Sequence, residues 1–439
     1  MYLLRCMRGI NCRYLSAWLK CDKSARFCIR HYTHLVAVIL LCVLAPQLAF
    51  GDLGQAQLIE GWERLENCFE GFRNREQKQG TVRISHIGDS HIIADFWTGE
   101  MRQKLQERFG DGGRGFVLGG EMWRSYGQRH IWHYTEGEWT VTNLKRGRDT
   151  GVFGPGGAAL ICDKLDCLTG VETREKQWAA RFDTLDIFTL GSGLGTDYNL
   201  YIDQKLYDTI NNFSPWLGIH RHRVHLPLSH HKVQVSPSHD QSELWLFGFS
   251  LQNSQGGLIY DSIGLNGSQA KHLLKNTDRS LQSIVKLLKS HLLVISFGIN
   301  EIFDRGYDRS DYAKNLDLLL SILRDPTLEY SDRFDCLLTG PFAALKRGSP
   351  PPELDEVYQI QRTLSNKYGC AFWDAREAMG GSIRPWQKRK RARKDGVHLS
   401  RQGYQRIATL FEESLMLSYH QWLSAKAKFQ QAPQMQSPP

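Results

Sequence analysis

After residue 51 the 439-residue sequence has no hydrophobic run long enough to cross a bilayer. It also lacks a Gly-rich phosphate loop, a Cys/His cluster with metal-ligand spacing and a nucleic-acid-binding module. These absences argue against phosphate-loop, metal-dependent and nucleic-acid-binding proteins. We therefore expect no cofactor, no metal ion and no nucleic-acid partner, and the sequence does not indicate an oligomeric state.

The first 51 residues differ in character from the rest of the chain. They carry seven Lys or Arg against one acid, then an apolar stretch at residues 35–45 and small residues at Ala49 and Gly51. This layout is typical of an export signal, and we expect cleavage after Gly51. An uncleaved membrane anchor is the alternative, because the apolar stretch extended to Phe50 approaches spanning length. Removing the leader's net +6 lowers the formal charge from +9 to +3, so basicity is poor evidence for nucleic-acid binding.

Cysteine usage agrees with export. Five of the ten cysteines lie in the leader, and the odd number that remains (Cys68, Cys162, Cys167, Cys336 and Cys370) leaves at least one unpaired. Cys162 and Cys167 are close enough to form a disulfide across a short loop in an oxidising compartment. Cys336 and Cys370 lie in apolar, strand-like runs, and we expect both to be buried thiols.

The tetrapeptide Gly88-Asp89-Ser90-His91 separates a predicted half-buried strand at residues 82–87 from a predicted helix at residues 96–109. A serine on such a turn has an exposed hydroxyl and neighbouring backbone N–H groups that provide half of an oxyanion hole. Gly-Asp-Ser is also ordinary turn chemistry. The assignment of Ser90 as a nucleophile therefore depends on finding a base elsewhere in the chain.

That base is offered by Asp395-Gly396-Val397-His398. A carboxylate three residues before an imidazole can hold the ring Nδ1–H, which leaves Nε2 free to take a proton from Ser90. Asn300 follows the apolar run at residues 292–296, where open α/β sheets hold their ligands. Individually, His398 could be a surface histidine and Asn300 a helix cap. Their occurrence together with Asp395 favours one catalytic site.

In sequence order, these segments resemble the four blocks of the SGNH (GDSL-type) hydrolases. The blocks match Gly88-Asp89-Ser90, Asn266-Gly267-Ser268, Gly298-Ile299-Asn300-Glu301 and Asp395-x-x-His398. The resemblance implies that Ser90 is the nucleophile, His398 the general base and Asp395 its orienting partner. It also implies an oxyanion hole made by the backbone N–H groups of Ser90 and Gly267 and the Asn300 side-chain amide. Gly264 competes with Gly267 for the second block, because both lie in the same turn.

A domain inserted between the first two blocks is indicated by their separation of 177 residues. Short, aromatic, strand-like segments punctuated by Gly, Asn and Asp predict an all-β sandwich there. The regular alternation that follows, including a helix at residues 269–290, predicts a parallel sheet with covering helices. The expected strands of the insert include residues 177–182, 198–202 and 243–249.

The expected fold class is therefore α/β, an SGNH three-layer fold with a parallel sheet, interrupted by a carbohydrate-binding-module-like β-sandwich. The leader or anchor is expected to end at residue 51. We expect the hydrolase domain at residues 52–118 and 258–426, the insert at 119–257 and a disordered tail at 427–439.

The whole arrangement resembles the periplasmic peptidoglycan O-acetylesterases of Gram-negative bacteria, most closely in Gly88-Asp89-Ser90-His91, residues 109–116 and residues 260–267. The resemblance implies a serine esterase that removes acetyl groups from an acetylated cell-wall glycan through an acetyl-serine intermediate. It also implies a periplasmic location, with anchoring to the inner membrane if the leader is retained. A polysaccharide O-acetyltransferase and a lipase or thioesterase are the alternatives. A departure is the basic run at residues 388–394, which is either a solvated loop or an attractor of anionic glycan.

Overall fold

A five-stranded parallel sheet forms the centre of the α/β part, in the order β13-β1-β14-β15-β16. The computed structural model describes residues 53–123, 127–146, 151–193, 195–240, 243–328 and 334–431. The predicted export signal lies outside these residues. The strands are β1 (Thr81–Gly88), β13 (Gly257–Gly264), β14 (Leu292–Ser296), β15 (Asp335–Thr339) and β16 (Ala371–Trp373).

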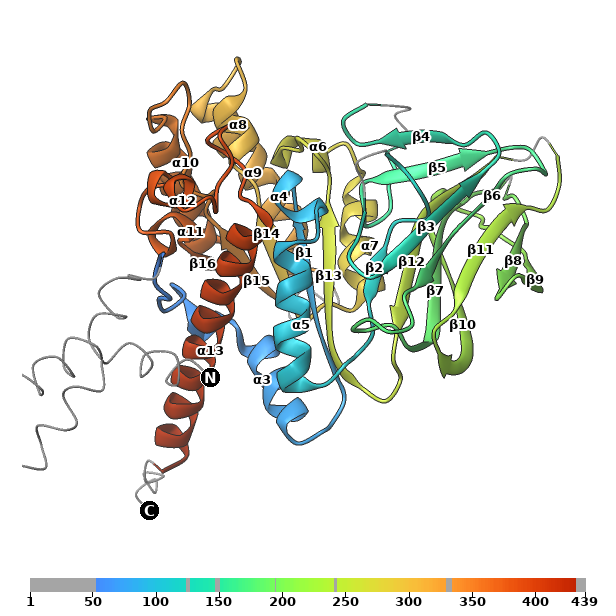
Figure 1. The fold of residues 1–439 in the computed structure, drawn as a ribbon, viewed down its shortest axis with the longest axis horizontal. Helices are drawn as coiled ribbons and strands as arrows, with labels where there is room; N and C mark the ends of the chain where they lie inside the picture. The colour runs from blue at the N-terminus through green and yellow to red at the C-terminus, as the bar shows by residue number, and fades with distance from the viewer. Residues whose placement is uncertain are drawn as a thin grey trace, which may run out of the picture. The chain divides into compact units, whose positions relative to one another are not determined.

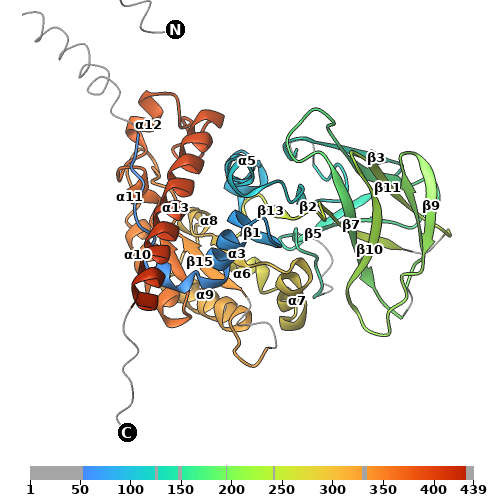
Figure 2. The same ribbon diagram turned by 90° about the horizontal axis from the view of Figure 1, so that it is seen from below.

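Helices cover both faces of this sheet (Figures 1 and 2). One face packs on α3 (Glu66–Glu76), α5 (Trp97–Phe109) and α13 (Arg401–Gln431). The other packs on α7 (Asp278–Leu288), α9 (Arg309–Leu323) and α10 (Glu353–Lys367). The prediction of a three-layer α/β fold with a parallel sheet is confirmed.

The predicted half-buried alternation of the first strand is wrong. In β1 every residue from Val82 to Gly88 is buried, because the strand lies between β13 and β14 and both sheet faces are covered. Arg83 tolerates this burial because its guanidinium forms two hydrogen bonds of 2.8 and 2.9 Å with the Asp261 carboxylate of β13. The pair connects two strands that are distant in the sequence.

The inserted region is a sandwich of two antiparallel sheets (Figures 1 and 2). One has the order β10-β7-β12-β5-β4 with β2 paired to β12, and the other has the order β3-β6-β11-β8-β9. Apolar side chains from both sheets form one core. The strands are β2 (Gly115–Val117), β3 (Ile131–Glu136), β4 (Thr140–Asn143), β5 (Ala158–Cys162), β6 (Leu168–Thr173), β7 (Phe182–Gly191), β8 (Tyr198–Ile202), β9 (Lys205–Ile210), β10 (Gly218–Ser229), β11 (Lys232–Pro237) and β12 (Leu244–Gln252).

Several predicted elements differ in extent from the observed ones. Residues 177–180 form a turn, so the strand expected at 177–182 begins only at Phe182. The helix expected at residues 269–290 is interrupted, and is replaced by α6 (Ala270–Leu273) and α7. Thr277 caps α7 by accepting from the Ser280 backbone N–H, while the Asn276 side chain accepts from the Phe153 N–H of the insert. Local capping and insert packing thus end the first helix early.

At the carboxyl end of the chain, α13 continues to Gln431. Residues 427–431 are therefore helical, where we expected the disordered tail to begin, and the rest of that tail lies outside the described residues. Most of α13 packs on the sheet, and the sequence before residue 432 has few polar, helix-breaking residues. The helix therefore continues past its last contact with the core.

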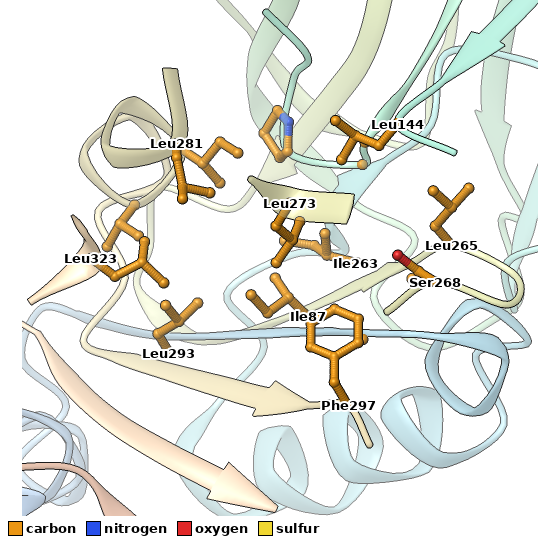
Figure 3. Close-up of a pocket in the computed structure, with 17 residues that line it drawn as sticks. Ile87, Leu144, Ile263, Leu265, Ser268, Leu273, Leu281, Leu293, Phe297 and Leu323 are labelled. Atoms are coloured by element: carbon orange, nitrogen blue, oxygen red, sulfur yellow. The ribbon is translucent and has the colours of Figure 1, made fainter. Parts of the chain in front are cut away.

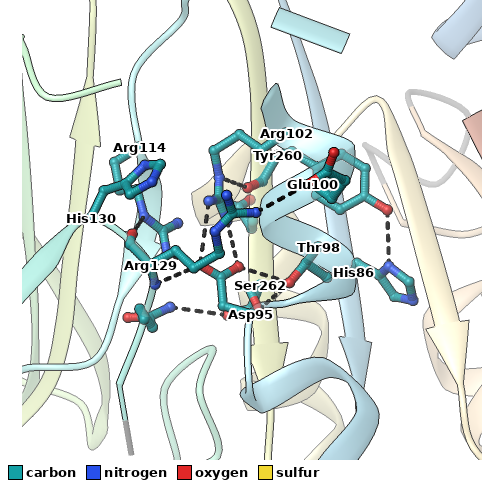
Figure 4. Close-up of polar contacts among 12 residues, drawn as sticks. His86, Asp95, Thr98, Glu100, Arg102, Arg114, Arg129, His130, Tyr260 and Ser262 are labelled. Atoms are coloured by element: carbon teal, nitrogen blue, oxygen red, sulfur yellow. Dashed lines mark hydrogen bonds and ion pairs between the residues drawn. The ribbon is translucent and has the colours of Figure 1, made fainter. Parts of the chain in front are cut away.

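A buried polar cluster connects the α/β part to the segment that enters the insert (Figure 4). The Asp95 carboxylate accepts from the guanidinium groups of Arg102 and Arg114 at 2.8 and 2.7 Å, and from the Arg129 backbone N–H at 2.9 Å. Burial raises the pKa of Asp95, but the two guanidinium groups outweigh it and hold that pKa well below its ordinary value. An ionised Asp95 therefore joins α5 to both Arg114 and Arg129.

Two disulfides are present among the described cysteines, and Cys68 is a buried free thiol. Cys162 and Cys167 pair as expected. The expectation of two buried thiols at Cys336 and Cys370 is wrong, because these residues form the second disulfide. Their Cα atoms lie 4.6 Å apart, since β15 and β16 are neighbours, a proximity that a sequence separation of 34 residues conceals.

Within the described ranges, no helix is long and apolar enough to cross a membrane. The same residues contain no group of three or more His, Cys, Asp or Glu arranged to hold a metal ion.

We predict that the two disulfides differ in their contribution to stability. Replacing both Cys336 and Cys370 by Ala should lower the free energy of unfolding by about 4 kcal/mol, because the cross-link constrains a long loop of the unfolded chain. The matched Cys162→Ala/Cys167→Ala variant should lose only about 2 kcal/mol, because its loop is short. Urea unfolding of the oxidised proteins measures both values. Equal stabilities of wild type and the Cys336/Cys370 variant would contradict the prediction.

Candidate active site

Ser90 lies at the first position of α4 (Ser90–Ile93), immediately after β1. Asp89 caps this short helix, because its Oδ1 accepts from the His91 backbone N–H at 2.9 Å. A Cβ atom at Gly88 would lie 2.6 Å from the Ser296 carbonyl oxygen of β14, so only glycine permits this approach of the strands. The turn therefore presents a partly exposed Ser90 at the carboxyl edge of the sheet.

The three residues predicted to carry catalysis are brought together, although Ser90 and His398 are 308 positions apart. The Ser90 Oγ lies 3.0 Å from His398 Nε2, and His398 Nδ1 lies 2.9 Å from Asp395 Oδ2. Both distances suit hydrogen bonds. With the proton on Nδ1, the ring donates to Asp395 and accepts the Ser90 hydroxyl proton at Nε2, which is the arrangement that general-base activation of a serine requires.

The electrostatics around Asp395 favour its charged form. Partial burial raises its pKa, but backbone N–H groups of Val397 and His398 and the His398 ring outweigh this effect, so the pKa falls below its ordinary value. Asp395 is thus ionised at neutral pH and available to orient the ring. The Asp395 and His398 side chains keep 44% and 34% exposure, so this side of the site is open to solvent.

Asp395 and His398 occupy the tip of a small hairpin. Its arms are joined by an antiparallel bridge between Ala392 and Leu399, and the Arg393 N–H donates to the His398 carbonyl at 2.8 Å. Gly396 has a φ of +75°, and a Cβ there would lie 2.9 Å from the Leu345 carbonyl oxygen. A close turn at glycine therefore holds the carboxylate and imidazole at the spacing seen.

Asn300 also reaches the site, but its amide is engaged within the protein. The residue belongs to α8 (Ile299–Phe303), which follows β14. Its Nδ2 donates to Asp89 Oδ2 and to the Ser268 carbonyl oxygen, both at 2.9 Å. Donation to an oxyanion therefore requires exchange of one of these bonds, and that role for Asn300 stays a prediction.

The two candidate glycines of the second block occupy different positions. Gly264 ends β13 opposite Gly88, and a Cβ there would lie 2.3 Å from the Ile93 nitrogen of α4. Gly267 lies in the following turn with a φ of +65°, next to Ser268, which accepts from Asn300. Close packing alone thus accounts for glycine at 264, and the assignment of the Gly267 N–H to the oxyanion hole stays a prediction.

Two buried residues, His91 and Glu301, support the site, although the sequence analysis gave them no role. His91 packs with its ring centroid 5.3 Å from that of His398, and its Nδ1 lies 2.8 Å from the Tyr404 hydroxyl. Burial lowers the pKa of His91 to about 3, so the ring is neutral. Glu301 accepts from the N–H groups of Ala270 and Gly298. It thereby joins the second and third blocks.

Asp89 is a buried acid directly beside the nucleophile. Burial raises its pKa to about 7, with a further contribution from nearby Glu301, although the His91 N–H works in the opposite direction. Its location inside the Gly-Asp-Ser-His motif was visible in the sequence. Its contact with Asn300 was not, because the two residues meet only through the β1–β14 pairing.

An apolar pocket lies beneath the nucleophile turn, between the sheet, α7 and the insert (Figure 3). Its lining includes Ile87 of β1, Ile263 of β13, Leu281 of α7 and Leu144 of the insert. Its free volume of about 30 Å³ holds only one or two water molecules. The pocket is therefore a packed junction, and neither Ser90 nor His398 lines it.

The fold and these contacts define the class of protein. Residues 234–406 match the GDSL-like Lipase/Acylhydrolase family, and the resemblance to the SGNH hydrolases is confirmed. The protein is a serine hydrolase. The matched range contains Asn300, Asp395 and His398, while Ser90 lies outside it and joins the site through the fold.

Among solved structures, the chain is similar to a peptidoglycan O-acetylesterase. The two are 24% identical with a TM-score of 0.69, and the match covers 81% of this chain and 96% of that chain. A lipase/acylhydrolase from Enterococcus faecalis is 18% identical with a TM-score of 0.29, over 38% and 77%. An acetyl xylan esterase, AlAXEase, is 18% identical with a TM-score of 0.29, over 36% and 80%. A search of curated proteins finds no match in sequence.

We predict that Asn300→Ala lowers kcat on a small acetyl ester by about 10²–10³, as expected when a donor to the developing oxyanion is lost. The matched control is Asn266→Ala, in an exposed residue of the neighbouring turn, which should retain activity. Thermal unfolding of both variants tests whether the fold is intact. A fall of less than about tenfold in a folded Asn300→Ala protein would remove Asn300 from the oxyanion hole.

Proposed function

We propose that this serine hydrolase removes O-acetyl groups from an acetylated cell-wall glycan. The observation that carries the proposal is the hydrogen-bonded series Ser90, His398 and Asp395 at an open edge of the sheet. Support comes from the fold shared with a peptidoglycan O-acetylesterase, including the inserted sandwich. An open site suits an ester carried on a polymer, because the backbone of a glycan cannot enter a closed cavity.

The proposed reaction has two halves. Ser90 Oγ attacks the acetyl carbonyl carbon while His398 Nε2 takes the hydroxyl proton, and His398 then returns that proton to the departing sugar oxygen. Water, deprotonated by His398, attacks the acetyl-Ser90 ester and releases acetate. In both halves, N–H groups of Ser90 and Gly267 and the Asn300 amide stabilise the charge on the carbonyl oxygen.

Acetyl transfer and lipid-ester hydrolysis are the alternatives. The same residues perform transfer if a second sugar hydroxyl replaces water, so the product decides between these two reactions. A series of acyl esters of increasing length decides whether the enzyme is instead a lipase or thioesterase.

We also propose that the protein acts after export, in the periplasm. The basic and apolar leader at residues 1–51 supports this location. Two disulfides support it independently, because such bonds persist in oxidising compartments. Retention of the leader would anchor the enzyme to the inner membrane.

The direct experiment incubates the protein with O-acetylated peptidoglycan and measures free acetate. We expect acetate release by wild type and none above background by Ser90→Ala, because the nucleophile is gone. Mass spectrometry after quenching should find the acetyl adduct on Ser90. Appearance of the acetyl group on an added glycan would instead identify a transferase, and preference for esters longer than butyrate would identify a lipase.

The insert is proposed to hold glycan through its outer surface. Trp132 on β3 is 51% exposed, and the Arg174 guanidinium lies 3.6 Å from its ring centroid. An exposed tryptophan offers a face on which a sugar ring stacks. The alternative is that the aromatic residues of the insert serve only its core, as many do.

We predict that Trp132→Ala lowers activity on insoluble glycan by about fivefold or more, while activity on a small chromogenic acetate changes little, since the loss of a stacking partner costs on the order of 1 kcal/mol. Phe213→Ala, in another exposed aromatic residue of the insert, is the control. Equal losses on both substrates for Trp132→Ala would mean that the residue only supports the fold.

A further inference from the structure

The catalytic hairpin carries a dense group of positive charges on one arm. Residues 379–394 contain seven Lys or Arg and no Asp or Glu. Residues 52–439 have a net charge of +3, so the remainder of that part of the chain is −4 once these seven charges are set aside. We name residues 384–394 the cationic arm. The excess of positive over negative charge is thus concentrated beside His398, because acids slightly outnumber bases in the rest of residues 52–439.

The cationic arm is firmly attached to the catalytic hairpin. Its backbone pairs with the other strand of the hairpin through the Ala392–Leu399 bridge, and the Ser400 N–H donates to the Arg391 carbonyl at 2.9 Å. The arm begins at α12 (Arg384–Lys388), where Trp386 is completely buried and donates to the Met379 carbonyl. A merely solvated loop would not need these anchors.

The positive charges of its lysines face solvent and are not balanced by acidic partners. Lys388, Lys390 and Lys394 are exposed, and no acidic side chain of the described chain forms an ion pair with any of them. Other exposed lysines do find partners, as Lys367 does with Asp317 at 2.6 Å. Closely spaced cations repel one another, so the arm costs stability. A ligand with negative charges would offset that cost.

We propose that the cationic arm binds carboxylate groups of the glycan polymer and so places its acetyl esters over Ser90. The inference rests on the proposed function for the ester and adds the substrate class, an acetylated glycan that bears carboxylates. Lys394 is adjacent to Asp395, so a carboxylate bound there lies within one Debye length, about 8 Å at physiological salt, of the catalytic hairpin. Fields of this kind raise local substrate concentration and association rates by about 10–10³-fold.

A charge-neutral variant and a matched control test the proposal. The variant is Lys388→Gln/Lys390→Gln/Lys394→Gln. The control is Lys78→Gln/Lys314→Gln/Lys428→Gln, which removes the same charge from exposed sites. Lys78 has a φ of +60°, like Lys390 at +56°, so backbone strain is matched. Lys78 precedes β1 whereas Ser90 follows it, which places Lys78 at the opposite end of that strand.

Three substrates are compared, namely O-acetylated peptidoglycan, the same polymer with its carboxylates converted to neutral methylamides, and 4-nitrophenyl acetate. We expect the ratio of polymer to small-ester activity to fall about tenfold in the Lys388/Lys390/Lys394 variant and to be unchanged in the control. Amidation of the polymer should remove the difference between the proteins, and added salt should narrow it. Equal ratios for the variant and the control, or no effect of amidation, would overturn the proposal.

A binding measurement separates this inference from the proposed function. In a Ser90→Ala background, cosedimentation with deacetylated peptidoglycan should weaken about tenfold on substitution of the three lysines. If wild type releases no acetate from any glycan but this binding persists, the esterase proposal fails while the carboxylate site stands. Lysine-dependent binding that is stronger to duplex DNA or phosphatidylglycerol vesicles than to peptidoglycan would overturn the choice of ligand.

Discussion

The pairing of β1 with β13 is the constraint on which the site depends. These strands align from Thr81 with Gly257 to Gly88 with Gly264, although an entire β-sandwich lies between them in the sequence. Arg83 and Ser85 both donate to the buried carboxylate of Asp261, which also accepts from the Phe116 N–H. A shift in register would leave these buried polar groups without partners, which is costly in a low-dielectric interior.

Correct register brings the polar side chains of one sheet edge together from separate segments. Because parallel strands end at the same edge, the turns after β1, β13 and β14 meet, and Asp89, Ser268 and Asn300 become hydrogen-bonded neighbours. Glu301 then holds the turn before α6. The insert can therefore be long, because only the positions of its two ends matter for the assembly of this edge.

The imidazole and its carboxylate arrive on a separate hairpin, which explains both the openness of the site and its electrostatic character. A hairpin at the edge of the sheet keeps His398 partly exposed, while buried His91 and Tyr404 support it from behind. The segment that leads into this hairpin has Lys388, Lys390 and Lys394 exposed. Catalytic geometry and attraction of an anionic polymer can thus reside in one short structural unit.

The sequence by itself determined the parts whose signals are local. Alternating strands and helices predicted the parallel sheet, and the motifs at Ser90, Asn300 and Asp395 to His398 predicted which residues meet. Only the tertiary structure decided features that depend on strands being neighbours. Burial of Arg83, the disulfide between Cys336 and Cys370 and the engagement of the Asn300 amide by Asp89 all arise from strand order and register. Residues far apart in a chain show no local pattern of such pairings, because the sheet that joins them forms only when the whole domain folds.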